Sequence, residues 1–377
     1  MHRYLEDAIR TDLATKIVIL SGPRQVGKTT LSKQLTASYV YLNYDSAADR
    51  KIIRNGEWSR STELVIFDEL HKMKNWKAWI KGVYDTEAIP PGLLLTGSAR
   101  LDTYKKGGDS LAGRFFAYRL HPLTVKEICS FLDETPKQAL DALIRFGGFP
   151  EPYLRKNETY TKRWRRTLVD TVIREDLLDL EKVRDVKSIE ILIDLLRSRV
   201  GSTTSYSSLA EELQVSVHTV KHWLQILETL YVVFPVRPYH RNIARSLLKE
   251  AKYYLYDTGG VEGNTSAKLE NIVALALLRE LHLLENTQGS KGELHYLRDK
   301  DKNEVDFLAV IDGKPTLLVE VKTGDDNFSK SLYRFQGYLS GTRAVQVVYD
   351  LRQAKSVPGK PIAMVPAHEF LENFTLL

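Results

Sequence analysis

Cysteine and long hydrophobic runs are what this sequence of 377 residues has least of. The single cysteine, Cys129, excludes an intramolecular disulfide and fits a reducing compartment. No run approaches the roughly 18 apolar residues that predict a membrane span, and Met1–Asp7 lacks the apolar core of a signal peptide. We therefore expect a cytoplasmic protein that makes no membrane contact.

Most of the chain also has no large excess of positive or negative charge. The net charge is +6, and the first 125 residues account for it with 19 basic and 13 acidic side chains. The apolar fraction of 43% and the charged fraction of 27% are those of an ordinary globular protein. The length predicts two or three domains. This charge permits nucleic-acid binding without demanding it.

The strongest motif follows Lys16. The apolar run Ile17–Leu20 predicts a strand, and the segment after Thr30 predicts a helix. The glycine loop between them is a phosphate-binding loop in its required context, because its backbone N–H groups and the helix N-terminus favour an anion. The sequence therefore predicts binding of a nucleoside triphosphate by Gly22, Pro23, Arg24, Gln25, Val26, Gly27, Lys28, Thr29 and Thr30.

Individual roles follow from the chemistry of these side chains. We expect Lys28 to reach the β- and γ-phosphates and the Thr29 hydroxyl to ligate Mg²⁺. The apolar run Leu64–Asp68 predicts a buried parallel strand that ends in two carboxylates. Asp68 should hold the Mg²⁺ shell, and Glu69 should orient and deprotonate the attacking water.

Four further positions are candidates for sensing or neutralising the γ-phosphate. Gly92–Ser98 predicts a strand with a polar end, where Thr96 or Ser98 either senses the phosphate or caps the following turn. Arg114 and Arg100 either neutralise charge on the γ-phosphate or lie on the surface. An arginine finger acting on a neighbouring copy would imply a homo-oligomer.

Several segments together carry a family resemblance. They are Gly22–Thr30, Phe67–Leu70 followed by Trp76 and Trp79, Thr96–Ser98, Ser110–Arg114, His121–Glu127 and Phe146–Glu151. They resemble a prokaryotic AAA-type ATPase family in which the ATPase is fused to a C-terminal domain of unknown function. The resemblance extends over essentially the whole chain. It implies ATP as the nucleotide.

A helical region and a helix-turn-helix follow the ATPase part. Val125–Leu196 has helical periodicity that Gly147–Pro150 interrupts. The basic run Lys162–Arg166 either contacts phosphates or a base, or forms a solvated helical face. Ser207–Leu213 and Ser216–Leu227 predict two short helices, each opened by a capping serine.

The second of these helices has two distinct faces. The buried face is predicted to contain Val217, Val220, Leu224 and Leu227, and the other face His218, Lys221, His222 and Gln225. Tyr231–Arg237 predicts a strand suited to a wing. A winged helix-turn-helix, which the resemblance also implies, reads a DNA major groove or serves protein contacts and nucleotide sensing. We favour DNA slightly.

The C-terminal part predicts a helix, Glu270–Leu281, that opens with an acid, followed by three strands. The strands are Leu294–Arg298, Asn303–Val310 and Thr316–Lys322, and Asp312-Gly313 predicts a hairpin between the last two. Pairing across that hairpin places Asp306 nearly opposite Glu320. Lys322 shares the face of Glu320 because it is two residues further along the strand. This arrangement indicates a PD-(D/E)xK nuclease-like fold.

The residue types in this set suit metal-dependent phosphodiester chemistry. Asp306 and Glu320, with Glu270 as a further ligand, are expected to hold a second Mg²⁺ or Mn²⁺. The metal would lower the pKa of a bound water, and Lys322 would position that water. Gln336 is expected to be an accessory polar group.

The predicted fold class is α/β, in four parts. They are a doubly wound P-loop ATPase core at residues 1–125, a helical linker at 126–196, a winged helix-turn-helix at 197–250 and a nuclease-like domain at 251–377. The leading hypothesis is a Mg²⁺-dependent ATP hydrolase that acts on DNA and controls a metal-dependent nuclease module. The alternative is an ATP switch that regulates or remodels DNA, branched DNA included, with a nuclease-like domain that only binds.

Overall fold

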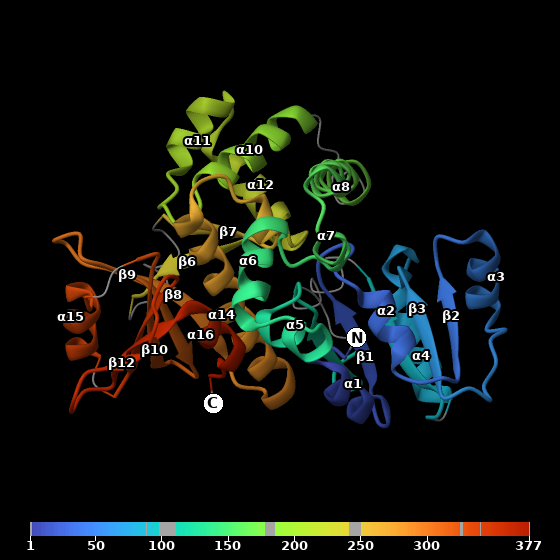
Figure 1. Ribbon diagram of the computed structural model, residues 1–377. Helices are drawn as coiled ribbons and strands as arrows, with labels where there is room; N and C mark the ends of the chain where they lie inside the picture. Colours follow the sequence, from blue (N-terminus) through green and yellow to red (C-terminus); the bar gives the residue numbers. More distant parts are fainter. Residues whose placement is uncertain are drawn as a thin grey trace. The chain divides into compact units, whose positions relative to one another are not determined.

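The computed structural model describes residues 2–87, 89–97, 111–177, 185–240, 250–324, 327–339 and 341–376 (Figure 1). The chain divides into two compact units. The first comprises Met1–His121 with Thr229–Tyr231, and the second comprises Pro122–Glu228 with Val232–Leu377. The predicted end of the ATPase part at Val125 lies close to the division after His121. Each unit contains its own β-sheet.

The sheet of the first unit has five strands in the order β2-β3-β4-β1-β5. All neighbours are parallel. The strands are β1 (Ile17–Ser21), β2 (Tyr39–Asn43), β3 (Leu64–Asp68), β4 (Gly92–Thr96) and β5 (Phe115–Arg119). Every residue of β1, β3 and β4 is buried, as expected for central strands of a parallel sheet. The strand predicted at Gly92–Ser98 is present as β4, which lies between β1 and β3.

The helices of this unit are α1 (Glu6–Leu13), α2 (Lys28–Gln34), α3 (Ala47–Asn55), the 3₁₀ turn η1 (Leu70–Lys72) and α4 (Trp76–Thr86). Helices α3 and α4 pack on the sheet face that contains Ile19 and Phe67. Trp58, Phe67 and Trp79 meet edge to face, with ring centroids 5.2–5.7 Å apart. This aromatic cluster anchors β3, whose last residue is Asp68.

The second unit begins with helices, as the periodicity predicted. They are α5 (Val125–Phe131), α6 (Pro136–Phe146), α7 (Pro150–Arg155), α8 (Glu158–Thr171), the π-helical segment Val172–Leu177 and α10 (Val186–Ser198). The interruption at Gly147–Pro150 is confirmed. A Cβ at Gly147 would lie 2.6 Å from Asp257 Oδ1, and the φ angle there is +80°. The break therefore needs glycine for both space and conformation.

Two short helices follow, α11 (Tyr206–Leu213) and α12 (Val217–Thr229). Ser216 accepts a hydrogen bond from the N–H of Thr219, as a capping residue should. The other predicted cap is wrong by two residues, because Ser205 rather than Ser207 caps α11. The predicted buried stripe is also wrong at Val217, which is 40% exposed.

The second sheet has eight strands in the order β12-β13-β11-β10-β9-β8-β6-β7. They are β6 (Val233–Pro238), β7 (Lys252–Leu255), β8 (Gly292–Arg298), β9 (Glu304–Ile311), β10 (Lys314–Lys322), β11 (Arg343–Val348), β12 (Lys355–Ser356) and β13 (Ile362–Pro366). The three predicted strands are present as β8, β9 and β10. The predicted hairpin at Asp312-Gly313 is present, with both residues at positive φ.

Strands β6 and β7 pair antiparallel after the two short helices, the order expected of a wing. However, Arg237 and Pro238 at the end of β6 also pair with β8. The predicted limit between residues 250 and 251 therefore falls inside one continuous sheet.

Further helices of the described residues are α14 (Thr265–Gln288), α15 (Lys330–Tyr338) and α16 (Ala367–Asn373), with the 3₁₀ turn η4 (Thr258–Gly260) before α14. Helix α14 begins earlier than predicted, because Asn264 caps it through the N–H of Ala267. Glu270 therefore lies within α14 and does not open it. In the part of the chain that the structure describes, no helix combines the length and apolarity needed to cross a bilayer.

Candidate functional site

The glycine loop lies between the end of β1 and the start of α2. Gln25 and Gly27 have positive φ angles of 62° and 100°, so the backbone reverses there to enter the helix. At Gly22, a Cβ would lie 2.4 Å from the carbonyl oxygen of Leu120. Only glycine allows this close approach between the loop and the segment after β5.

Lys28 lies inside the loop. Its ammonium donates to the carbonyls of Gly22 at 2.9 Å and Pro23 at 2.8 Å, and the residue is buried. Val26 is fully buried, and its carbonyl accepts a hydrogen bond from Arg3. Arg3 is itself buried, and no motif in the sequence points to it. The predicted nucleotide set from Gly22 to Thr30 thus spans the loop and the start of α2, and the Lys28 side chain turns back onto the loop carbonyls.

Asp68 is the centre of a hydroxyl network at the carboxyl end of β3. Its Oδ1 accepts from the Thr96 hydroxyl at 2.6 Å. Its Oδ2 accepts from Tyr41 at 2.7 Å and from Thr29 at 3.1 Å. Burial, and then the bond to Asp68, raises the pKa of the Tyr41 phenol, so Tyr41 remains a donor. Four elements, α2, β2, β3 and β4, therefore converge on one carboxylate.

The separation of Thr29 and Asp68 fits a magnesium site. Neighbouring ligands around an octahedral Mg²⁺ at 2.0–2.1 Å lie about 3 Å apart. The hydroxyl of Thr29 and the carboxylate oxygen of Asp68 are 3.1 Å apart. These two oxygen donors suit a hard cation that keeps most of its water ligands.

Glu69 follows Asp68 in a left-handed conformation, with φ of 56°. Its backbone N–H donates to the carbonyl of Thr96 at 3.0 Å, which fixes it to the end of β4. Its carboxylate lies 3.5 Å from His71 and 3.8 Å from Lys72. Burial lowers the pKa of Lys72, but the bond to Asp45 and the charge of Glu69 outweigh this and raise it. Glu69 thus lies beside Asp68 at the same edge of the sheet.

The other residues predicted to contact the γ-phosphate are Thr96, Ser98, Arg100 and Arg114. Thr96 is fully buried and directs its hydroxyl to Asp68, so its position supports the carboxylate. Ser98 and Arg100 lie outside the described residues.

Arg114 is not near the nucleotide edge of its own chain. It precedes β5, whose Phe115 pairs with Ile17 at the start of β1, whereas the loop follows the opposite end of β1. Its guanidinium pairs with Asp85 at 2.7 Å. A role for Arg114 on its own nucleotide is therefore wrong, because the length of a strand separates the two. Arg119, which pairs with Ser21 beside the loop, occupies the end that the sequence reading missed.

In the second unit, Asp306 and Glu320 lie on adjacent antiparallel strands. Val319 pairs with Phe307, so the register places Glu320 opposite Asp306, as predicted. Asp306 Oδ2 accepts from the N–H of Val321 at 2.8 Å. Lys322 donates to Glu320 Oε1 at 2.8 Å. Glu320 Oε2 is buried without a hydrogen-bond partner among the described residues.

Lys252 on β7 is the residue that the sequence reading missed. Its ammonium lies 2.6 Å from Glu304, 3.8 Å from Glu270 and 4.0 Å from Asp306. Glu270 also accepts from the Tyr254 hydroxyl at 2.7 Å. The described residues contain no group of three or more His, Cys, Asp or Glu arranged to hold a metal ion. The expected role of Glu270 as a metal ligand therefore disagrees with the structure, which gives it a lysine partner.

Glu270, Glu304, Asp306 and Glu320 form an acidic cluster, in which burial is the largest influence on the pKa values of Glu270, Asp306 and Glu320. Burial, followed by the charge of Asp306, raises the pKa of Glu270 to about 7 and that of Glu320 to about 7. Burial also raises the pKa of Asp306. Burial lowers the pKa of Lys252, but the three neighbouring carboxylates outweigh this and raise it. Lys252 is thus a cation at neutral pH.

The central residues of the basic run on α8 make contacts within the fold. Trp164 is buried and packs on Phe149 with ring centroids 5.1 Å apart, which favours a packing role for this ring over contact with a base. Arg165 donates to Asp257 at 2.7 Å and to the Phe146 carbonyl at 2.8 Å. Lys162 and Arg166 line a cleft of about 530 Å³ that also contains acidic side chains.

On α12, the predicted polar face is partly confirmed. His218, Lys221 and Gln225 are exposed, and His222 is half-buried. The ammonium of Lys221 lies 5.3 Å from the ring centroid of Tyr206.

Gln336, the predicted accessory polar group, lies on α15 and is half-buried. No contact within the described part of the chain places it at the acidic cluster.

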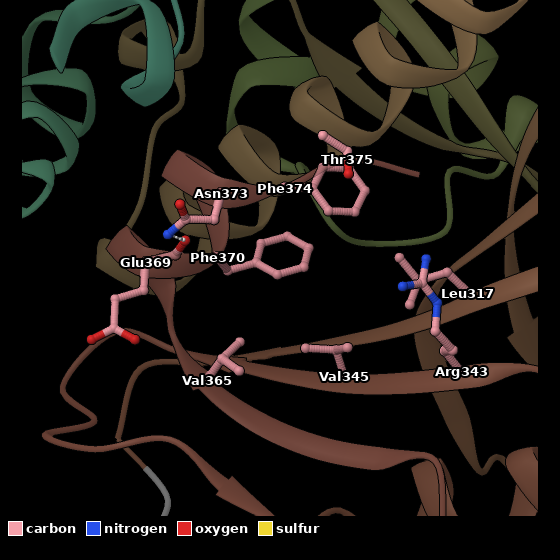
Figure 2. Close-up of a pocket in the computed structure, with 9 residues that line it drawn as sticks. All are labelled: Leu317, Arg343, Val345, Val365, Glu369, Phe370, Asn373, Phe374 and Thr375. Carbon is pink, nitrogen blue, oxygen red and sulfur yellow. Dashed lines mark hydrogen bonds between the residues drawn. The ribbon is translucent and has the colours of Figure 1, made fainter. Parts of the chain in front are cut away.

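A separate pocket of about 390 Å³ lies between α16 and the strands β10, β11 and β13. Figure 2 shows Phe370 facing Val345 and Val365, with Arg343 at one end and Glu369 at the other. The pocket shares no lining residue with the acidic cluster. Its walls are mainly apolar and hold no pair of carboxylates.

Family models match three consecutive parts of the chain. Residues 14–129 match an AAA domain, residues 137–262 match the domain of unknown function DUF8612, and residues 265–369 match the domain of unknown function DUF4143. The five-stranded parallel sheet, the glycine loop and Asp68 agree with the first match. The N-terminal part is therefore a P-loop ATPase domain of the AAA type.

The curated relatives are distant. The chain is 26% identical over 328 residues to an uncharacterized protein of Mycobacterium tuberculosis, across 84% of this chain and 72% of the relative. It is 23% identical over 359 residues to one of Methanocaldococcus jannaschii, across 86% and 79%. Among solved structures, a Thermotoga maritima RuvB variant is similar at 18% identity and a TM-score of 0.32. That alignment covers 60% of this chain and 85% of the RuvB chain. A similarity this weak carries no functional argument.

Proposed function

We propose that this chain is a Mg²⁺-dependent ATP hydrolase that acts on DNA. The observation that carries the hydrolase proposal is the pair of oxygens from Thr29 and Asp68, 3.1 Å apart beside the Lys28 loop. This separation suits two neighbouring ligands of one Mg²⁺. The placement of Glu69 immediately after Asp68 adds a carboxylate at the same edge.

Each side chain has a distinct role in this proposal. Lys28 exchanges its two carbonyl partners for the β- and γ-phosphates of ATP, and the backbone N–H groups of the loop surround the phosphates. Thr29 and Asp68 would hold Mg²⁺, which offsets phosphate charge when bound. Glu69 orients a water for in-line attack on the γ-phosphorus and accepts its proton.

Support for action on DNA comes from the second unit. Helices α11 and α12 followed by the antiparallel strands β6 and β7 have the element order of a winged helix. The exposed Lys221 and His218 on α12 would face a DNA groove or backbone. With one lysine and few other cations on this face, we expect binding to DNA shape and phosphates more than to sequence.

A second candidate function is metal-dependent phosphodiester cleavage by the C-terminal part. Its support is the register that sets Asp306 opposite Glu320, with Lys322 on the same face. Glu320 Oε2 has no hydrogen-bond partner among the described residues, which leaves one acceptor for a cation. The competing proposal is a nuclease-like domain that only binds, which the lysine beside Glu270 favours.

Steady-state ATP turnover with different DNA forms tests the hydrolase proposal and the proposed action on DNA in one experiment. The wild type should hydrolyse ATP in Mg²⁺ but not in EDTA, and duplex, single-stranded or branched DNA should change the rate. Lys28→Ala should abolish nucleotide binding, because it removes the cation inside the loop. The same incubations, analysed for DNA fragments, report cleavage. ATP turnover that no DNA form alters would remove DNA from the proposal and leave the ATPase assignment intact.

A further inference from the structure

Lys252 is a buried cation among half-buried acids. Only 2% of the residue is exposed, and its ammonium forms a close ion pair with Glu304 at 2.6 Å. The distances to Glu270, at 3.8 Å, and Asp306, at 4.0 Å, are too long for strong hydrogen bonds but short for charge attraction in a poorly solvated site. Three carboxylates from α14 and β9 therefore surround one ammonium from β7.

The surroundings of Glu270 hold its carboxylate in this place. The Tyr254 hydroxyl donates to Oε1 at 2.7 Å. On the other side, a Cβ at Gly201 would lie 2.8 Å from both carboxylate oxygens. Glu270 is thus packed between Gly201, Tyr254 and Lys252, so its carboxylate is kept in range of the ammonium.

A half-buried group of acids this close together needs a cation, because like charges in a poorly solvated site repel one another unless an opposite charge offsets them. In nuclease-like sites that cation is a divalent metal. Here the position between the acids is filled by the side chain of Lys252, and a metal ion bound to the same oxygens at about 2.1 Å would overlap it. The two cations exclude one another.

We propose that the ammonium of Lys252 is the resident cation of this cluster and takes the place of a divalent metal between Glu270, Glu304 and Asp306. The inference builds on the candidate metal site proposed above and restricts it. A metal ion can then be held only on the side of Asp306 that faces Glu320, whose Oε2 is buried without a partner among the described residues. Removal of the lysine charge opens a second position.

The test counts bound Mn²⁺ by electron paramagnetic resonance in a Lys28→Ala background without nucleotide, which removes the ATP-linked site. Lys252→Met should bind one more Mn²⁺ than this parent. Lys252→Arg should bind no more than the parent, because it keeps the charge. Lys291→Met, which removes an exposed lysine paired with Glu293, is the matched control and should not change the count.

The melting temperature supplies a second readout. Lys252→Met leaves three half-buried acids without a cation. It should therefore melt well below the parent in EDTA and regain stability in Mn²⁺, since a ligand that binds the native state stabilises it. If Lys252→Met does not fold, the double variant Lys252→Met with Glu304→Gln removes one charge of each sign. This variant keeps Glu270 and Asp306 and should still gain the ion.

The outcomes separate this inference from the second candidate function. Equal Mn²⁺ counts in the parent, Lys252→Met and the double variant would overturn the role of Lys252. No bound ion in the parent and one in Lys252→Met would support Lys252 and remove the metal-dependent cleavage proposal. One ion in the parent that Glu320→Gln abolishes, and two in Lys252→Met, would support both.

Discussion

Replacement of Asp68 by asparagine separates the structural role of this side chain from its magnesium role. Asparagine has the same shape, but it has no charge and keeps only one acceptor oxygen. Asp68 accepts three hydroxyl bonds, from Thr96 at 2.6 Å, Tyr41 at 2.7 Å and Thr29 at 3.1 Å. A hydrogen bond to a charged group contributes about 1.5–3 kcal/mol, against about 0.5–1.5 kcal/mol for a neutral pair. The nucleotide-free domain should therefore lose roughly 3 kcal/mol of stability at most, because relief of the buried charge offsets part of the loss.

The larger effect should appear in magnesium-dependent binding. Loss of groups that merely support a metal ligand weakens metal binding about 10- to 100-fold, so loss of the charged ligand itself should reach at least about 100-fold. We expect Asp68→Asn to bind ATP in EDTA as the wild type does, but to gain little affinity when Mg²⁺ is added. Titration of a fluorescent ATP analogue with and without Mg²⁺ measures the ratio directly.

Asp45→Asn is the matched control for this experiment. It makes the same chemical change at a half-exposed acid that pairs with Lys72 at 2.6 Å, and it should keep the wild-type ratio. Asp68→Asn with an undiminished response to Mg²⁺ would show that Asp68 is not a magnesium ligand. The reasoning from the 3.1 Å separation would then be refuted.

Three further predictions concern space, assembly and pH. Gly22→Ala should weaken ATP binding at least tenfold by titration, because its Cβ would lie 2.4 Å from the Leu120 carbonyl oxygen, and unchanged binding would contradict the close approach. If Arg114 acts on a neighbouring copy, specific ATPase activity should rise with protein concentration and Arg114→Ala should abolish the rise, whereas activity independent of concentration excludes this role. The pKa values of Glu270 and Glu320, raised by burial to about 7 from 4.5, favour the folded state below about pH 4.5, and this stability is lost as the pH rises through 7. Glu270→Gln should flatten that part of the melting-temperature profile of the second unit, and an unchanged profile would contradict the raised pKa.

The sequence predicted the strand, loop and helix around Lys28 because their features are local. A strand, a glycine loop and a helix within Ile17–Leu35 specify their own geometry, and the apolar run before Asp68 must be a central strand. The position of Arg114 could not be predicted in the same way. It depends on which end of β5 lies beside the loop, and that follows from pairing with β1 across nearly 100 residues of chain.

The acidic cluster shows the same limit. The two-residue turn predicted the hairpin, but its register alone would pair Asp306 with Val319. A bulge between Pro315 and Leu317 shifts the pairing by one residue, so that Asp306 lies opposite Glu320. Lys252 comes from β7, which reaches the cluster only through the long-range order of the sheet. A lysine in the short run Lys252–Leu255 has no local signal that distinguishes a buried counter-ion from a surface charge. The need for a cation at this place can be recognised only in the folded sheet, because only there do the three acids lie close together.

The central claim, that Glu69 activates water for hydrolysis of bound ATP, is tested most directly by single-turnover hydrolysis in Glu69→Gln. The substitution keeps the size of the side chain and removes the proton acceptor. We predict wild-type ATP affinity with hydrolysis slowed about 10²- to 10⁴-fold. Glu63→Gln, an exposed acid just before the opposite end of β3, should hydrolyse ATP at the wild-type rate. Wild-type turnover by Glu69→Gln would contradict the claim.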